Sequence, residues 1–188
     1  MKNADNCGKY IYCIEGNWND NPRSNQSVKP ILDLLYSFYK VKYIYRKCVT
    51  RDEFLEGLQT FTQKRYSNYT ILYIAYHGQK NCIDFGNDNF ITLQEIANVL
   101  EGKLNGKIVH FGSCSTLHTS LKNIADFITR TGCSLMSGYR KDIEFFSGSA
   151  FELVYFELLQ QFTSLRKIQS TVTKKYQTFV ENIQFFMM

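Results

Sequence analysis

The stretch KIVHFGSC at residues 107–114 decides how the rest of the chain is interpreted. It is a short apolar run that stops at a glycine and a serine and carries Cys114 to the start of the next segment. A second run of the same kind, ILYIAYHG at 71–78, ends on His77 and Gly78. The pattern predicts two buried strands, one followed by a thiol and the other by an imidazole.

Strand-like segments recur along the whole chain on either side of this pair. β-Branched and aromatic content predicts strands at 9–16, 41–46, 71–78, 107–114 and 133–139. Short apolar runs around Gly86 and Asn87 predict a small hairpin after His77.

Helix-like segments separate these strands. Two capping-box patterns, Thr50 with Glu53 and Thr92 with Glu95, mark helix starts. Apolar spacing predicts a helix from Ser27, one directly after Cys114 that ends at Gly132, and two more at about 147–162 and 164–183. The inward positions expected for these helices are Ile31, Leu34, Leu35, Phe38, Phe54, Leu58, Phe61, Leu93, Ile96, Val99, Leu100, Leu117, Leu121, Ile124, Ile128, Ile168, Val172, Tyr176, Phe179 and Ile183.

Strands that alternate with helices predict an α/β fold, a three-layer sandwich with a mainly parallel central sheet, as a single domain over residues 1–188. Ligands bind such sheets in the crevice outside the carboxyl ends of the strands. His77, Cys114, Glu15 and the turn after the fifth strand are all expected there.

Composition excludes several classes of function for a protein with this fold. Of 188 residues, 22 are Lys or Arg and 17 are Asp or Glu, so the net charge of +5 is modest. It is also spread along the chain, which argues against a nucleic-acid surface. The N-terminal MKNADNCGKY has no apolar stretch and no segment is long enough to span a membrane, so we expect a cytoplasmic protein. Six cysteines without a CxxC pair are expected to be free thiols.

Cys114 is the candidate nucleophile and His77 the candidate base. A helix that opens directly after Cys114, capped by Ser115 or Thr116, would lower the thiol pKa, and a neighbouring imidazolium would lower it further. Backbone amides near Gly78 and at the Ser113–Cys114 turn could donate to an oxyanion. The alternative is a structural cysteine and a satisfied histidine, but both lie at strand ends beside glycines, which favours catalysis.

A zinc site competes for the same part of the chain. His110, Cys114 and His118 have helical spacing, and Cys82 lies close to His77 in the sequence. The segment around His110 is strand-like and a Gly-Ser pair interrupts it, so the three would not share a helical face. We therefore expect no metal and no cofactor, with His110 inside the sheet.

The motifs ILYIAYHG and IVHFGSCST resemble those of caspase-like cysteine peptidases, the group that contains caspases, separases, gingipains and bacterial CHAT domains. The resemblance covers about residues 9 to 162 and is greatest to the CHAT and separase members. It implies that Cys114 is the nucleophile and His77 the base, that the substrate is a protein or peptide, and that a regulatory partner controls cleavage in bacterial defence or signalling. The Gln-Ala-Cys signature of caspases and an arginine at the end of the first strand are absent.

The resemblance also bears on substrate preference. In separase- and CHAT-like members an acidic residue after the strand that follows the cysteine strand lines the pocket for a basic side chain. Here YRKDIE supplies Asp142 and Glu144 at that place, and Glu15 could assist. Arg140 and Lys141 could instead neutralise the acids or favour an acidic substrate.

Three functions from different classes follow from the sequence. The first is a cysteine endopeptidase that cleaves a protein partner after a basic residue under regulatory control. The second is a non-catalytic interaction or scaffold module of the same fold, which the presence of both Cys114 and His77 disfavours. The third is a flavodoxin-like or TIR-like nucleotide-binding domain, disfavoured because EGNWND stands where a Gly-rich phosphate loop would follow the first strand.

Overall fold

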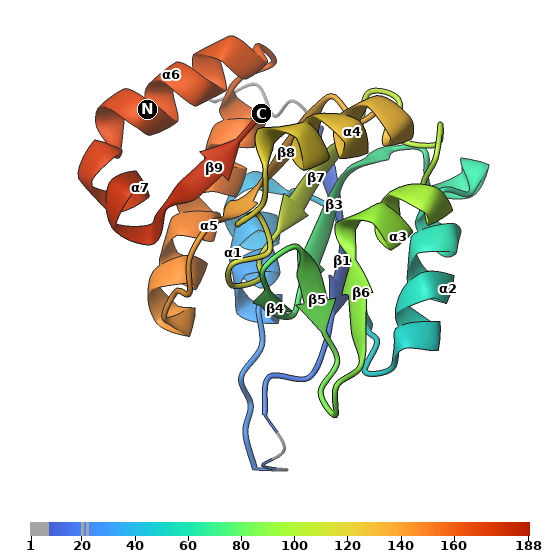
Figure 1. Cartoon of the computed structure of the whole chain (residues 1–188). Coiled ribbons are helices and arrows are strands. Elements are labelled where there is room, and N and C mark those ends of the chain that lie inside the picture. Colours follow the sequence, from blue (N-terminus) through green and yellow to red (C-terminus); the bar gives the residue numbers. More distant parts are fainter. Residues whose placement is uncertain (1–7, 20, 22) are drawn as a thin grey trace.

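The computed structural model describes residues 8–19, 21 and 23–188, so Cys7 lies outside the described residues. Its centre is a six-stranded sheet in the order β2-β1-β3-β7-β8-β9, in which all strands but the last are parallel (Figure 1). The strands are β1 Tyr10–Glu15, β2 Tyr43–Lys47, β3 Tyr69–Ala75, β7 Ile108–Phe111, β8 Leu135–Tyr139 and β9 Phe185–Met187. The prediction of an α/β fold with a mainly parallel sheet is confirmed.

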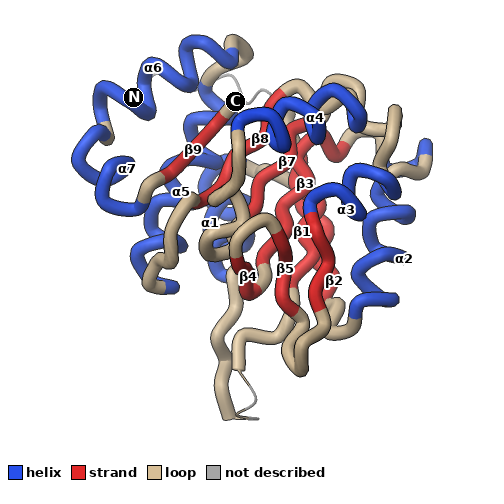
Figure 2. Tube along the Cα trace, viewed as in Figure 1, coloured by secondary structure: helices blue, strands red, loops and turns tan. Residues whose placement is uncertain are grey.

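Helices cover both faces of this sheet, as Figure 2 shows. They are α1 Lys29–Tyr39, α2 Arg51–Phe61, α3 Leu93–Val99, α4 Leu121–Thr131, α5 Phe145–Gln161, α6 Leu165–Lys175 and α7 Gln177–Ile183. Successive residues of β1 face opposite sides, as a strand requires: Ile11 and Cys13 join the core under α1, α5, α6 and α7, and Tyr12 and Ile14 join the core under α2, α3 and α4. The sheet is therefore the middle of three layers.

A second, antiparallel sheet follows β3. It consists of β4 His77–Gln79, β5 Cys82–Asp84 and β6 Phe90–Thr92, which confirms the predicted hairpin and adds a third strand to it. The Thr116 hydroxyl donates to the Cys82 carbonyl oxygen at 3.2 Å, so the small sheet is tied to the segment that carries Cys114.

Both predicted capping boxes are present, at Thr50 with Glu53 and at Thr92 with Glu95. The expected inward face of α1 is partly wrong. Its buried residues are Ile31, Leu32 and Leu35, whereas Leu34 and Phe38 are 41% and 75% exposed. Helical spacing fits either stripe, and the position of the neighbouring sheet selects one of them.

The helix predicted to open directly after Cys114 is wrong, because α4 begins at Leu121 with Ser120 as its N-cap. Residues 114–117 form a turn instead, with Ser115 in the left-handed region at φ 54°. Leu117, expected on the helix, is fully buried in the turn, while Leu121 is 58% exposed. The dense Ser and Thr residues of SCSTLHTS favour turns over a helix interior, a signal that the apolar spacing masked.

The single helix predicted at 164–183 is also wrong, since the chain forms α6 and α7 with a break at Tyr176. After Gln184 at φ 45°, β9 pairs antiparallel with β8 and completes the sheet, a strand that the sequence did not predict. The structure has no helix within the described residues that combines the length and the apolar character needed to cross a membrane.

Candidate active site

His77 stands at the rim where β3 ends and β4 begins. Tyr76 precedes it and is buried, which anchors the chain at this corner, while the His77 side chain is exposed. Its Nε2 lies 2.7 Å from the carbonyl oxygen of Trp18. Because a carbonyl oxygen can only accept, Nε2 carries the hydrogen, and in the neutral ring the lone pair is on Nδ1.

Trp18 lies in the loop that leaves β1 and is itself held by Glu15. The indole Nε1–H donates to Glu15 Oε1 at 2.6 Å, and the Val28 amide donates to the same oxygen at 2.7 Å. The hydroxyls of Ser27 and Tyr45 donate to Oε2. Glu15 is fully buried, so its four bonds fold the loop back over the end of β1.

Cys114 lies in the turn after β7, which is bound to the end of β8. The Ser115 amide donates to the Lys141 carbonyl oxygen at 3.0 Å, and the Ser115 hydroxyl donates to Asp142 Oδ1 at 2.7 Å. The left-handed conformation of Ser115 is unusual for a residue other than glycine and often marks a functional turn. The Ser115 hydroxyl thus contacts Asp142, whereas the Cys114 thiol contacts the backbone of Ile143.

The surroundings of Cys114 do not make it a preformed thiolate. Burial raises the pKa of its thiol, and the Asp142 charge adds to this, while the Ile143 amide, 3.4 Å from Sγ, opposes it. No helix begins at Cys114, so the expected contribution of a helix dipole is missing. The prediction of a lowered thiol pKa is wrong for the described conformation.

One pocket collects side chains from the ends of four neighbouring strands. Its volume is about 100 Å³. The loop after β1 contributes Trp18 and Val28, the segment after β3 His77, that after β7 Gly112 and Cys114, and that after β8 and the start of α5 Ile143, Phe145 and Glu152. Trp18 packs edge-on against His77 and Phe145, with ring centroids 5.4 and 5.0 Å apart. Cys114 and His77 therefore line the same pocket.

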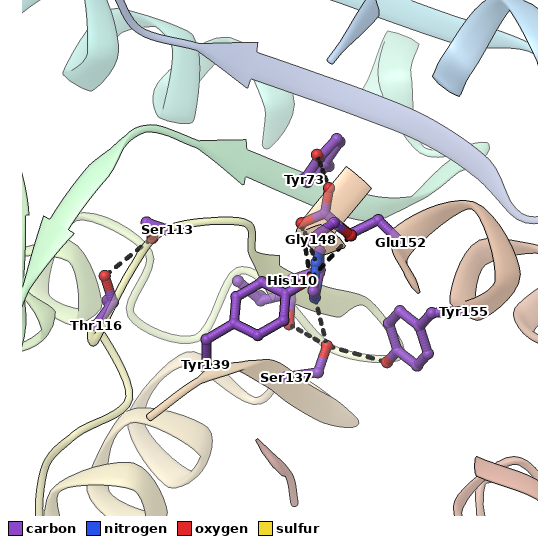
Figure 3. A network of polar contacts seen from close by, with 10 residues as sticks. Tyr73, His110, Ser113, Thr116, Ser137, Tyr139, Gly148, Glu152 and Tyr155 are labelled. Atoms are coloured by element: carbon purple, nitrogen blue, oxygen red, sulfur yellow. Dashed lines mark hydrogen bonds and ion pairs between the residues drawn. The ribbon is translucent and has the colours of Figure 1, made fainter. Parts of the chain in front are cut away.

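Glu152, which lines the pocket, belongs to a buried polar network (Figure 3). Glu152 Oε1 lies 3.1 Å from His110 Nε2 and accepts from the Tyr139 hydroxyl at 3.2 Å, and Oε2 accepts from the Tyr73 hydroxyl. His110 Nδ1 lies 3.0 Å from the Ser137 hydroxyl oxygen. His110 is inside the sheet, as predicted, and both of its ring nitrogens have partners.

The residues expected near an oxyanion lie beside the Cys114 turn. A Cβ at Gly78 would collide with Thr116 Oγ1 and with the Cys114 carbonyl oxygen, so the two segments are in direct contact there. The Ser113 side chain is buried, and its hydroxyl oxygen lies 2.9 Å from that of Thr116. Neither residue is among the pocket lining, and their amides remain a prediction.

The three acids expected to bind substrate do not line the pocket. The Glu15 carboxylate already accepts hydrogen bonds from the loop after β1. Asp142 is exposed and accepts from Ser115, and Glu144 is the N-cap of α5, where it accepts from the amides of residues 146 and 147. Glu152 is the acid that does line it, at 3% exposure.

The sequence analysis did not identify two site residues, Trp18 and Glu152, although the sequence contains a signal for each. Trp18 is the one tryptophan of the chain and stands in a polar loop, where an aromatic residue needs a packing partner. Glu152 interrupts the apolar run SAFELVYF, and a carboxylate on a buried helix face needs buried donors.

Two comparisons with known proteins complete this description. The chain belongs to a family described as a family of unknown function (DUF6642), whose model matches residues 8–188. A search of the curated proteins found no match. The matched range spans the large sheet, both helical layers and the pocket.

Proposed function

We propose that this chain is a cysteine endopeptidase of the caspase-like type, with Cys114 as nucleophile and His77 as general base. The observation that carries the proposal is that both residues line one pocket, where four neighbouring parallel strands end. This rim is where open α/β sheets bind ligands. A thiol paired with an imidazole is the arrangement that nucleophilic catalysis uses.

In the proposed reaction, His77 Nδ1 takes the proton of the Cys114 thiol while Sγ attacks the carbonyl carbon of the scissile peptide bond. The imidazolium then gives this proton to the leaving amine, and a thioester remains on Cys114. Water, deprotonated by the same imidazole, hydrolyses the thioester and restores the thiol. Amides beside Gly78 and at the Ser113–Cys114 turn are the proposed donors to the oxyanion.

The Trp18 carbonyl supports this role for His77. It accepts from Nε2–H and thereby leaves the Nδ1 lone pair available as the base. When the ring becomes an imidazolium, the same carbonyl dipole stabilises its charge. A third group that orients the base is a recurring part of such sites.

The raised pKa of Cys114 bears on regulation. A thiol that is protonated at neutral pH depends on His77 at the moment of attack, and Ile143 lies against Sγ through both its amide and its carbonyl oxygen. The described conformation then corresponds to a resting enzyme. Control by a protein partner remains part of the proposal.

The residue before the cleaved bond is the next part of the proposal. We propose cleavage after a basic residue, as the resemblance implies, and the carboxylate within the pocket is Glu152 rather than Asp142, Glu144 or Glu15. A cation beside Glu152 would gain a charge-assisted hydrogen bond. Profiling a peptide library with the wild type and Asp142→Asn would show whether Asp142 contributes, since only a direct role predicts loss of basic substrates.

The test of the dyad is alkylation by iodoacetamide near neutral pH with mapping of the modified cysteines. Cys82 is the internal control, because it too is only partly buried and its pKa is also raised by burial. We expect Cys114 to react fastest and His77→Ala to slow Cys114 at least tenfold while leaving Cys82 unchanged. Equal rates at the two thiols, unaffected by His77→Ala, would refute the dyad and favour a scaffold.

A nucleotide-binding function has one observation in its favour and two against it. The parallel strands follow the order 2-1-3-4-5 found in flavodoxin-like folds. However, the loop after β1 holds the buried carboxylate of Glu15, and the pocket holds Glu152. Both acids would repel a phosphate.

A further inference from the structure

The buried carboxylate of Glu15 lies at the end of β1 without lining the pocket. It receives donors from three separate parts of the chain: Trp18, the Ser27–Val28 segment and Tyr45 on β2. Four donors on one carboxylate satisfy its hydrogen-bonding capacity, which leaves little for a substrate. The carboxylate therefore acts on these donors rather than on a substrate.

One of the four donors, Trp18, also contacts His77, the candidate base. The Trp18 indole is fastened to Glu15 at one end, and its backbone carbonyl accepts from His77 Nε2–H at 2.7 Å. The indole ring also packs edge-on against the imidazole and against Phe145. Trp18 therefore contacts His77 through both its backbone and its ring.

The backbone at this corner leaves little freedom for other arrangements. Gly16 follows Glu15, and a Cβ at Gly16 would collide with the ring of Tyr76, the residue that precedes His77. The Gly16 amide donates to the Ala75 carbonyl oxygen at 2.9 Å. The ends of β1 and β3 are thus in direct contact, which brings Trp18 within reach of His77.

We infer that Glu15 is a positioning residue for His77 and acts through Trp18. The carboxylate holds the indole N–H, the indole holds the Trp18 backbone, and the Trp18 carbonyl determines which ring nitrogen of His77 carries the hydrogen. This inference rests on the proposed function only where it calls His77 a base. The contact itself can be measured without any substrate.

Replacing Glu15 would leave four buried or partly buried donors unpaired and could unfold the protein, so the test acts on the donors. Trp18→Phe removes the indole N–H but keeps an aromatic ring and the backbone carbonyl. Tyr45→Phe removes one hydrogen bond to the same carboxylate, on the side away from His77, and is the matched control. Both variants should unfold at similar urea concentrations.

The first readout is the nitrogen–hydrogen NMR signal of His77 Nε2, which is visible only when a hydrogen bond protects it from exchange. We expect it in the wild type and in Tyr45→Phe, and we expect its loss in Trp18→Phe. The second readout is Cys114 alkylation, which should fall about tenfold in Trp18→Phe, equivalent to one hydrogen bond to a charged group, and stay within about twofold in Tyr45→Phe.

An absent signal in the wild type, an unchanged signal in Trp18→Phe, or equal losses in both variants would overturn the inference. Failure of the proposed function looks different. If His77→Ala leaves Cys114 alkylation unchanged while the Nε2–H signal still depends on Trp18 and not on Tyr45, then Glu15 positions His77 but the peptidase proposal is wrong.

Discussion

His110, in β7, and His77, just beyond the neighbouring strand β3, have opposite environments. His110 is fully buried, and its two ring nitrogens lie beside Ser137 and Glu152. His77, just beyond β3, is exposed and has one ring nitrogen on the Trp18 carbonyl while it lines the pocket. A ring with both nitrogens engaged contributes to stability, whereas a ring with one free nitrogen can move a proton. Four predictions test this distinction.

The largest expected effect is a loss of stability when the buried network around His110 is disrupted. Glu152→Ala removes the partner of Tyr73, His110 and Tyr139 at once and leaves their polar atoms unpaired in the core. We expect a loss of about 3–5 kcal/mol in the free energy of unfolding, measured by urea titration. Glu144→Ala is the control on the same helix and should cost about 1 kcal/mol as a lost cap. Similar losses in the two variants would contradict the importance of the network.

The second prediction compares the histidines directly. His110→Ala should cost about 2–3 kcal/mol, because it creates a cavity and leaves Glu152 short of a donor. His77→Ala should change the free energy of unfolding by less than about 0.5 kcal/mol, because its side chain is exposed. Urea titration of both variants decides this. A large loss of stability in His77→Ala would mean that the rim, too, is structural.

The third prediction concerns Gly78, which is tightly packed although it lies at the rim. Gly78→Ala would push a methyl group into the Cys114 carbonyl oxygen and Thr116, so we expect a loss of about 2 kcal/mol and slower Cys114 alkylation. Gly86→Ala has open space around its Cβ and pays only for its positive φ of 83°, about 1 kcal/mol. If Gly78→Ala leaves alkylation unchanged, the small sheet does not support the Cys114 turn.

The smallest effect is a change in pH dependence. Burial raises the pKa of both Cys114 and Cys82, so either thiolate forms only as the pH rises above the ordinary thiol value of about 8.5. In wild type, His77 should give Cys114 additional alkylation at lower pH. In His77→Ala this excess should disappear, and the rates of both thiols should rise only at alkaline pH. A low-pH excess that survives the substitution would assign activation to another group.

The candidate pair itself was visible in the sequence. Short continuous apolar runs that end at Gly residues located β3 and β7, and the parallel connection followed from the helices between them. Glu15 has a different role from the one that the sequence predicted. Its position at the end of β1 was predicted, but its role was not, because its four donors come from residues up to 30 positions away.

The sequence by itself determined the alternation of strands and helices, both capping boxes and the arrival of His77 and Cys114 at one rim, since these depend on local periodicity and on residues within a few positions of each other. The tertiary structure alone decided that the Cys114 turn is held by β8 instead of opening a helix, that β9 closes the sheet, and that Glu152 rather than Asp142 faces the pocket. These depend on contacts between distant segments, whose energies no local pattern records.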